Sequence, residues 1–403
     1  MPEKQIVLKN CGFVDPGDIN TYLARDGFKA LDKAWKQMTP QQVVEEVKES
    51  GLRGRGGAGF PTGLKWELTS KSPEQERFVI CNADEGEVGT FKDRYIIQGD
   101  PFEIVEGIAI AGYAIEAERG YIYLRAEYHY LRDLLENAIE QARNRGFLKK
   151  RNGTPFDIEV REGAGAYICG EESALMESIE GKRGEVRFRP PFPPDQGLWQ
   201  RPTVINNVET LANISHIILN GAHWFRRIGT EQSKGTKVFS VSGDVEKPGV
   251  YELTMGSPVT ELVETLAQAK SVKAVQVGGA SGRLLPAEKL DTPLAFEGIL
   301  GAGAVLVFSR DRDIIEMVWK NMEFFAEESC GKCVPCREGT QVMCDILERI
   351  SQAQGAEEDL TILDELANTM MLASLCGLGQ AAPNSVVDSV LYFRDEYEAR
   401  IGK

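Results

Sequence analysis

The chain has 403 residues, 42% hydrophobic and 27% charged, which is long enough for two to four globular domains. Its formal net charge of −15 argues against a nucleic-acid-binding surface, because such surfaces need clustered lysine and arginine. No apolar run approaches the roughly 18 residues of a membrane span, and the N-terminal residues lack an apolar signal region. We therefore expect a cytoplasmic protein without direct membrane insertion.

A glycine-rich segment, LRGRGGAGFPTGLKW at residues 52–66, is the first strong pattern. It follows a predicted helix that begins after Thr39, whereas a Rossmann fingerprint follows a strand, so its GxGxxG match is not taken as that fingerprint. Glycines let backbone N–H groups converge on an anion, and Arg53, Arg55 and Lys65 add positive charge. The segment predicts a phosphate- or ring-binding loop, with a glycine-rich packing loop as the alternative.

Carboxylates follow the first predicted strand. The run FVIC at residues 78–81 is typical of a short buried strand, and NADEGE at residues 82–87 lies at its carboxyl end. In open α/β sheets that end carries ligand-binding residues. We expect these side chains to accept hydrogen bonds from ribityl or ribose hydroxyls and to repel a 2′-phosphate. A solvated acidic turn is the alternative.

A second segment has the same form. AYIC at residues 166–169 is also predicted as a strand, with Gly170, Glu171 and Glu172 at its end and a helix after them. These residues are therefore further binding candidates at the same edge of a sheet.

A proline-rich run, RPPFPP at residues 189–194, presents Phe192 in a stiff extended segment. Asn206 and Asn207 then precede a helical stretch. Phe60 and Phe192 are candidates to stack on flat heterocycles, and burial in a hydrophobic core is the alternative for each.

Two regions complete the predicted organisation. Residues 236–312 contain short strands around one helical stretch, a pattern that suits a β-grasp. From Asp313 onward four amphipathic helices are expected, enough for a small bundle, with Val342 and Ile346 on the apolar stripe of the second.

Three cysteines in ESCGKCVPCREGT, at positions 330, 333 and 336, precede a fourth at position 376. A CxxCxxC run with one remote cysteine favours a [4Fe–4S] cluster, whereas structural zinc usually takes two separated CxxC pairs. Zinc and four reduced thiols without metal are the alternatives. We expect Gly331 and Gly339 to relieve the turn and one-electron transfer to be the task of the cluster.

These motifs together resemble the NADH-binding flavoprotein subunit of respiratory complex I and of NAD-dependent hydrogenases and formate dehydrogenases. The resemblance covers almost the whole chain and rests on GRGGAGFPTGLKW, CNADEGE, GAYICGEES, RPPFP, INNVETL and ESCGKCVPCREGT. It implies an α/β fold with a Rossmann-like FMN-binding sandwich, a ubiquitin-like β-grasp domain and a four-helix bundle carrying the cluster. The expected domain limits are 1–235, 236–312 and 313–403.

The resemblance also implies roles for individual residues. FMN, held non-covalently, would be contacted by Gly54, Gly56, Gly57, Lys65, Asn82, Asp84, Glu85, Gly170, Glu171, Asn206 and Asn207, with Tyr167 close by. Phe60 and Phe192 would flank the adenine of NADH, and Glu87 and Glu172 would lie near its ribose hydroxyls. The cluster ligands would be Cys330, Cys333, Cys336 and Cys376.

The implied activity is that of an NADH dehydrogenase, with NAD preferred over NADP. Hydride exchange between NAD(H) and FMN, which needs no catalytic side chain although Glu85 lies nearby, would be followed by one-electron transfer through the cluster. The implied partners are a separate thioredoxin-like [2Fe–2S] subunit and a larger iron–sulfur or catalytic subunit. Details such as KRGEVRFRPPFP and CGLGQAAPN favour a soluble hydrogenase, electron-bifurcating ones included, or a formate dehydrogenase, with complex I as the alternative.

Other classes of protein remain as rivals. One is a regulatory iron–sulfur scaffold with an inactive nucleotide site, and another is a zinc-containing binding module. An NADPH-dependent flavoprotein similar to glutamate synthase would need a strand-led dinucleotide fingerprint, which the sequence lacks.

Overall fold

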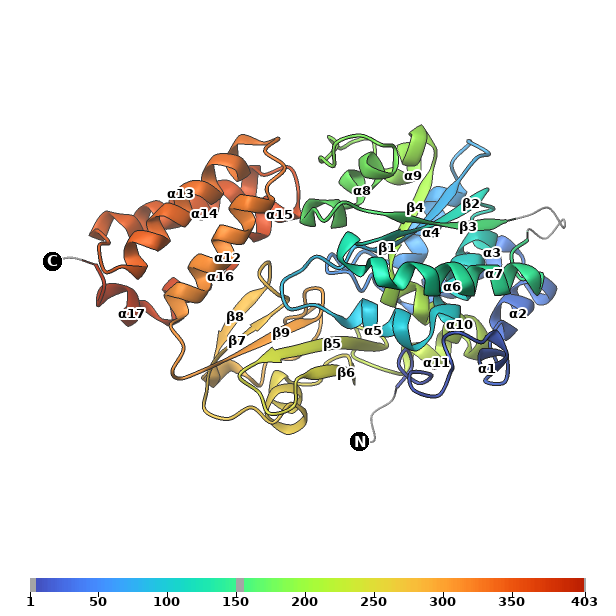
Figure 1. Ribbon diagram of the computed structural model, residues 1–403, viewed down its shortest axis with the longest axis horizontal. Coiled ribbons are helices and arrows are strands. Elements are labelled where there is room, and N and C mark those ends of the chain that lie inside the picture. Colours follow the sequence, from blue (N-terminus) through green and yellow to red (C-terminus); the bar gives the residue numbers. More distant parts are fainter. Residues whose placement is uncertain (1–4, 150–155, 402–403) are drawn as a thin grey trace.

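The computed structural model describes residues 5–149 and 156–401. Within these residues it contains a four-stranded sheet of order β3-β2-β1-β4 and a five-stranded sheet of order β6-β5-β9-β7-β8. Figure 1 shows the second sheet (yellow) below the first, and the C-terminal helices (orange to red) beside both. The fold is therefore α/β, followed by a β region and a helical region.

All four strands of the first sheet are parallel: β1 (Phe78–Ala83), β2 (Arg119–Leu124), β3 (Asp157–Glu162) and β4 (Thr203–Asn207). Successive side chains of a strand point to opposite faces, and here both faces are buried. Val79 and Cys81 face one core, whereas Phe78 and Ile80 face another that continues into the C-terminal helices. The predicted strand at residues 78–81 is confirmed.

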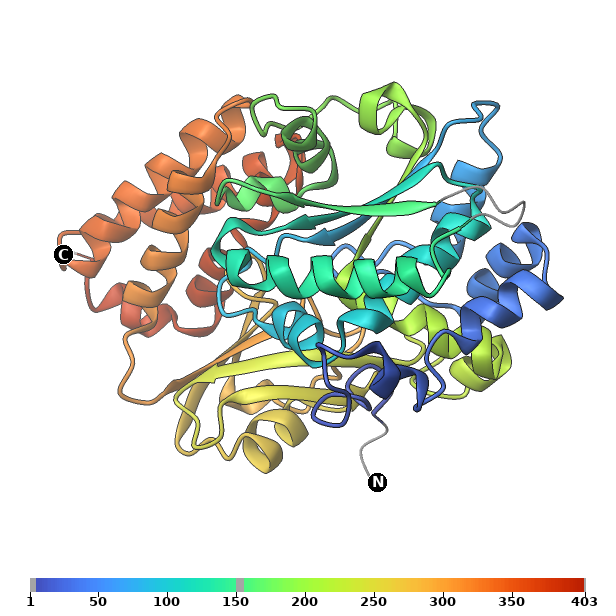
Figure 2. The same ribbon diagram turned by 45° about the vertical axis from the view of Figure 1, so that its right-hand side comes forward.

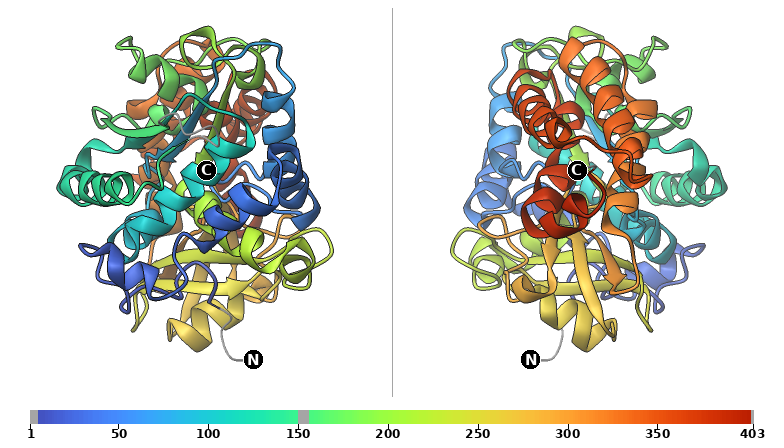
Figure 3. Two further views of the ribbon diagram at one scale, coloured as in Figure 1. Left: turned by 90° about the vertical axis from the view of Figure 1, so that its right-hand side faces the viewer. Right: turned by 90° about the vertical axis from the view of Figure 1, so that its left-hand side faces the viewer.

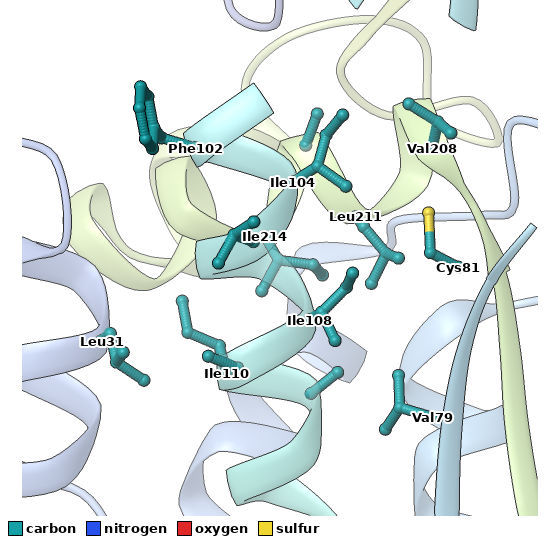
Figure 4. Close-up of a cluster of buried hydrophobic side chains, with 14 of the residues drawn as sticks. Leu31, Val79, Cys81, Phe102, Ile104, Ile108, Ile110, Val208, Leu211 and Ile214 are labelled. Atoms are coloured by element: carbon teal, nitrogen blue, oxygen red, sulfur yellow. The ribbon is translucent and has the colours of Figure 1, made fainter. Parts of the chain in front are cut away.

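Two helices, α6 (Pro101–Ala114) and α10 (Val208–Asn220), form the centre of the first core (Figure 4). They approach very closely, because a Cβ added to Gly107 would lie 2.4 Å from the carbonyl oxygen of Leu211. Figure 2 shows α7 (Arg132–Asn144) crossing the outer face of the same region. Other helices around the first sheet are α1 (Ile19–Leu23), α2 (Lys29–Gln37), α3 (Pro40–Ser50), α4 (Thr62–Ser70), α5 (Lys92–Gly99), α8 (Glu172–Ile179), α9 (Pro193–Gln196) and α11 (Ala222–Arg226).

One expectation for this region is confirmed and another is wrong. Helix α3 begins after Thr39, whose hydroxyl caps it, and runs into the glycine-rich loop as predicted. The strand predicted at residues 166–169 is wrong, because Tyr167–Gly170 form a 3-10 turn. The strand of this region is β3, which ends before Gly163 and Gly165, and a four-residue apolar run does not by itself distinguish a strand from a turn.

The second sheet has its own core and consists of β5 (Thr236–Gly243), β6 (Gly249–Thr254), β7 (Val272–Val277), β8 (Arg283–Pro286) and β9 (Ala304–Ser309). Only β5 and β9 pair in parallel, and the other pairs are antiparallel. A short π-helix, Glu261–Leu266, lies in the predicted helical stretch. The predicted strands are present, and β8 is additional.

The C-terminal helices are α12 (Ile314–Glu328), α13 (Val334–Ser351), α14 (Glu357–Ala373), α15 (Gly377–Ala381), α16 (Asn384–Tyr392) and α17 (Arg394–Glu398). Figure 3 shows them at the end of the molecule opposite the N-terminal helices (blue). No helix among residues 5–149 and 156–401 is long and apolar enough to cross a membrane.

Three details of the predicted helices are corrected. The expected last helix is broken at Phe393, where φ is −128° and ψ is 35°. Val342 is 41% exposed, and Met343 takes the buried position instead. Gly339 lies inside α13, where it leaves room for Met370, rather than in the turn; Gly331, with φ of +77°, is the glycine that the turn requires.

Candidate functional site

The parallel pairing of β1 and β4 brings their asparagines together at the carboxyl edge of the first sheet. Asn82 lies opposite Asn207, and Cys81 lies opposite Asn206. The glycine-rich loop lies over this edge, since a Cβ added to Gly56 would be 3.0 Å from Asn207 Cβ. Three stretches separated in the sequence therefore meet at one place, as predicted for a binding site at this edge.

The glycine-rich loop presents free backbone amides. Its ends are anchored, because Gly54 N–H donates to the Phe60 carbonyl (2.9 Å) and Arg55 N–H donates to Thr210 Oγ1 (2.8 Å). Between the anchors, the N–H groups of residues 56–60 meet no acceptor within the described part of the chain. Gly57, with φ of +117°, has a conformation that favours glycine. A row of free amides suits a phosphate, so this loop fits FMN.

Lys65 supplies the positive charge of this edge. Its Nζ lies 3.2 Å from Glu172 Oε2 and 3.1 Å from the carbonyl oxygen of Ile205. Glu172 also lies 2.9 Å from Arg189. Although burial alone would raise it, the two cations lower the pKa of Glu172, so this carboxylate remains charged.

The side chain of Arg55 is directed differently from that of Lys65. It is buried, and its guanidinium donates to the carbonyl oxygens of Arg53 (3.0 Å), Lys234 (2.6 Å) and Thr236 (3.1 Å). Arg55 thus ties the loop to the start of the second sheet. Its role as a cofactor contact stays a prediction.

Glu85 and Asp84 follow β1. Glu85 accepts hydrogen bonds from the N–H groups of Asp93 (2.7 Å) and Arg94 (3.2 Å) at the start of α5 and from the Tyr128 hydroxyl (3.0 Å). Burial raises the pKa of Glu85 to about 7 and that of Asp84 to about 7. Both carboxyl groups therefore titrate near neutrality.

The Tyr167–Gly170 turn closes over the same edge. Asn82 Nδ2 donates to the Gly170 carbonyl (2.9 Å), and Tyr167 donates its hydroxyl to Glu87 (2.9 Å). Glu171 caps α8 by accepting from the N–H of Ser173 (2.9 Å) and Ala174 (3.0 Å). The side chains of Phe60 and Phe192 are 44% and 51% exposed, so neither is a core residue. The carboxyl edge of the first sheet therefore brings together Gly56, Asn82, Gly170 and Asn207, and the contacts of all the candidates with cofactors stay predictions.

Sequence reasoning missed Ser281. This residue of the loop between β7 and β8 donates its hydroxyl (2.5 Å) and its N–H (3.2 Å) to Glu87. The second sheet thus contributes to the site. The run GGASG at residues 278–282, at the end of a predicted strand, could have indicated this loop. It is glycine-rich like residues 52–66.

A buried network of four charges, also missed, lies beneath Asn207. Asn207 Nδ2 donates to Asp93 (2.6 Å), and Lys92 Nζ lies 2.6 Å from Asp93 and 3.0 Å from Glu209. Lys237 Nζ, from β5, lies 2.6 Å from Glu209. We call Lys92, Asp93, Glu209 and Lys237 the buried ion network; no pattern in the sequence distinguishes these residues from exposed ones.

Four cysteines share one pocket. Cys330, Cys333, Cys336 and Cys376 line it together with apolar side chains that include Ile168. Cys333 lies at the start of α13 and Cys376 at the start of α15, so helix beginnings position both. The structure thus brings the remote fourth cysteine to the other three.

The donor set of this pocket fits a [4Fe–4S] cluster. Burial and the neighbouring thiols raise the pKa of Cys336 to about 11, so metal binding has to displace its proton. In residues 5–149 and 156–401, no three His, Cys, Asp or Glu side chains are spaced to share a single ion. A cubane instead binds each thiolate at a different iron, and four thiols in one pocket match that requirement.

Comparison with known proteins identifies each region. Residues 47–216 match the family described as the Nuo51 FMN-binding domain, residues 238–267 match the SLBB domain, and residues 316–400 match the NADH-ubiquinone oxidoreductase-F iron-sulfur binding region. The FMN-binding match includes the glycine-rich loop, and the iron-sulfur match includes all four cysteines of the pocket.

Full-length relatives come from two kinds of complex. The chain is 44% identical to NADP-reducing hydrogenase subunit HndC of Solidesulfovibrio fructosivorans, over 98% of this chain and 83% of that one. It is also 44% identical to the F 2 subunit of NADH-quinone oxidoreductase from Rhizobium meliloti (strain 1021), over 98% of this chain and 97% of that one.

A solved structure of an NAD+-reducing [NiFe]-hydrogenase in the H2-reduced state matches with a TM-score of 0.89 and 43% identity. The match covers 95% of this chain and 66% of the hydrogenase chain, which is therefore considerably longer. Taken together, the three regions and these relatives show that the chain belongs to the family of FMN- and [4Fe–4S]-binding subunits of NADH-dehydrogenase-type oxidoreductases.

Proposed function

We propose that this chain oxidises NADH, or reduces NAD+, as the flavoprotein subunit of a multisubunit redox complex. When bound, FMN exchanges a hydride with NAD(H), and the cluster carries single electrons. The observation that supports this most strongly is a shared wall. Ile168 lines the cysteine pocket and belongs to the turn whose Gly170 carbonyl accepts from Asn82 at the carboxyl edge of the first sheet. If FMN binds at this edge, a single turn of chain would separate the two redox sites.

The protein supplies binding and orientation. The free amides of residues 56–60 and Lys65 would hold a phosphate, and the exposed rings of Phe60 and Phe192 would stack on adenine. Glu172 remains charged, which would repel a 2′-phosphate and so favour NAD over NADP. HndC, by contrast, is named as NADP-reducing, so a direct comparison of NADH and NADPH is informative.

For the parent complex, we infer a soluble hydrogenase or formate dehydrogenase in the cytoplasm, electron-bifurcating complexes included. The likeness to the [NiFe]-hydrogenase chain supports this. The quinone oxidoreductase relative and HndC are both 44% identical to this chain, so complex I is the second candidate. In either case a thioredoxin-like [2Fe–2S] subunit and a larger iron–sulfur subunit are the proposed partners. The subunits that co-purify with the chain distinguish these complexes.

A finer description of the fold accompanies this proposal. The first sheet, with its strand order β3-β2-β1-β4, would be one half of a Rossmann-like arrangement. The second would be a ubiquitin-like β-grasp domain and the C-terminal helices a four-helix bundle with short additions. We propose limits of 1–235, 236–312 and 313–403 for the three domains.

The decisive experiment is to purify the full chain by itself and measure its FMN content, its iron content and its NADH-dependent reduction of ferricyanide. We expect one FMN and one cluster per chain, with electron transfer from NADH. A colourless protein with stoichiometric zinc, or a flavin that NADH does not bleach, would show that this function is wrong.

A further inference from the structure

Glu87 has no free acceptor position in this structure. Its Oε2 accepts from the hydroxyls of Ser281 (2.5 Å) and Tyr167 (2.9 Å), and its Oε1 accepts from the Ser281 N–H (3.2 Å). The Gly279 backbone covers Oε1 as well, since a Cβ added to Gly279 would lie 2.6 Å from that oxygen. A carboxylate offers about four acceptor positions. A ribose hydroxyl that binds Glu87 therefore has to displace a donor that is already there.

The three donors are not equally easy to displace. The Ser281 N–H belongs to a backbone loop that is held in turn by Asn384 of α16, whose Nδ2 donates to the Ser281 carbonyl (2.8 Å). The two hydroxyls can turn away by side-chain rotation. Of these, the Tyr167 hydroxyl makes the longer bond, so it is the donor that an incoming hydroxyl replaces most easily.

Tyr167 is also attached to the helix that leads to the cysteine pocket. Its backbone N–H donates to Glu328 Oε2 (2.9 Å), and Glu328 is the last residue of α12, two positions before Cys330. Its ring meets those of Phe324 and Phe325 of the same helix edge to face, with centroids 5.0 and 6.2 Å apart. One residue therefore contacts both the nucleotide-side carboxylate and the segment that carries the first cluster ligand.

We propose that Tyr167 is a positioning residue that transmits nucleotide binding at Glu87 to the cluster loop. The inference rests on the proposed function, in which Glu87 receives a ribose hydroxyl of NAD(H). Displacement of the Tyr167 hydroxyl changes how its ring packs on Phe324 and shifts the carboxylate of Glu328. The environment of the cluster then differs between the free and the nucleotide-bound protein.

The test is the electron paramagnetic resonance spectrum of the cluster in the holoprotein, kept reduced in every sample by excess dithionite, with and without saturating NAD+. In the wild type we expect NAD+ to shift the g values of the signal. Tyr167→Phe removes the hydroxyl but keeps the ring and the N–H, so its spectrum without NAD+ should resemble that of nucleotide-bound wild type. Glu328→Ala removes the other end of the connection, and NAD+ should then leave the signal unchanged.

Two matched variants control for nonspecific effects. Glu327→Ala removes the same charge from an exposed position next to Glu328, and Tyr251→Phe removes a hydroxyl that donates to the Lys247 carbonyl (2.6 Å) in the second sheet. Both should respond to NAD+ as the wild type does. If Glu327→Ala also abolishes the response, the cause is through-space charge and not Tyr167, and the inference is overturned.

The inference can fail while the proposed function stands. A wild-type signal that NAD+ does not change, or a Tyr167→Phe protein that responds normally, overturns the role of Tyr167. In both cases the FMN content, the cluster signal and ferricyanide reduction by NADH still establish the function. Loss of all three in the wild type would instead overturn the proposed function itself.

Discussion

The carboxyl edge of the first sheet, where FMN is proposed to bind, and the cysteine pocket are stabilised in different ways. We call the former the flavin-side edge. At the edge, Asn207 is fixed by the buried ion network, in which each charge has an opposite partner within 3.0 Å. In the pocket, by contrast, the one side-chain hydrogen bond to a ligand thiol in the described residues joins Ser329 Oγ to Cys336 Sγ (3.3 Å). The edge is therefore organised by the protein itself, whereas α13 and α15 would be joined chiefly by the cluster.

The largest expected effect follows from the second half of this comparison. Cys376→Ser removes the proposed ligand that would connect α15, through the cluster, to the loop before α13. We expect the iron content to fall from about four per chain to near zero and the amides of α13 to α15 to exchange faster, because cluster binding is folding energy there. Flavin binding should persist, since the edge has its own partners. Iron analysis, flavin fluorescence and hydrogen exchange measure the three outcomes.

Cys344→Ser is the matched control, because this buried cysteine of α13 does not line the pocket. It should keep its iron. If Cys376→Ser also releases the flavin, the two sites are not stabilised separately and the comparison fails.

The next effect tests the buried ion network. Glu209→Ala leaves Lys92 and Lys237 buried without their shared partner. Removing one member of a buried ion pair costs about 3–5 kcal/mol of unfolding free energy, because the remaining charge is uncompensated. Urea denaturation measures the loss. Glu398→Ala, which breaks an exposed pair with Arg394, should cost less than about 1 kcal/mol. Equal losses in the two variants would contradict the view that the network organises the edge.

The same contrast explains what the sequence could predict. Spacing predicted Cys330, Cys333 and Cys336 as ligands, because a CxxCxxC run supplies three of the four thiolates that a cluster needs, and the family resemblance implied Cys376 as the fourth. The strand at residues 78–81 and the helix after Thr39 were visible from apolar periodicity and a capping residue. Such signals come from residues close together in the sequence, and these two elements form as the nearby residues predict.

The remaining features depend on tertiary contacts. Ser281 reaches Glu87 across 194 positions of chain, and Lys237 reaches Glu209 from the second sheet. No periodicity encodes such pairs. The turn at Tyr167–Gly170 was predicted as a strand because a short apolar run does not by itself distinguish a strand from a turn. The contacts that a side chain makes at the site thus depend on the tertiary structure, and the sequence motif alone does not predict them.

A smaller effect concerns the charge at the flavin-side edge. Lys65→Met keeps an unbranched side chain, one heavy atom shorter, and removes the cation, whose Nζ lies 6.0 Å from the centroid of the Phe60 ring at the end of the free amides. We expect the dissociation constant of FMN to rise about tenfold, which corresponds to about 1.4 kcal/mol. Lys71→Met, at an exposed position paired with Glu67, is the control and should leave it unchanged. Fluorescence titration of the apoprotein with FMN measures both. An unchanged constant for Lys65→Met would place the phosphate elsewhere.

The smallest expected effect is a pH dependence. Burial raises the pKa of Asp84 to about 7, whereas an unfolded aspartate titrates near 3.9. Between these values the folded protein binds more protons than the unfolded chain, so this carboxyl group makes the free energy of unfolding fall as pH rises from about 4 to about 7. Asp84→Asn does not titrate. Relative to wild type it should therefore gain stability on going from about pH 5 to about pH 8, by on the order of 1 kcal/mol.

Urea denaturation with excess FMN at the two pH values measures this difference in the free energy of unfolding. Asp133→Asn, at an exposed position of α7, is the control and should show no such gain. If Asp84→Asn instead loses stability relative to wild type between these pH values, the folded protein stabilises Asp84 as a charged carboxylate. Water or a cation would then reach this side chain.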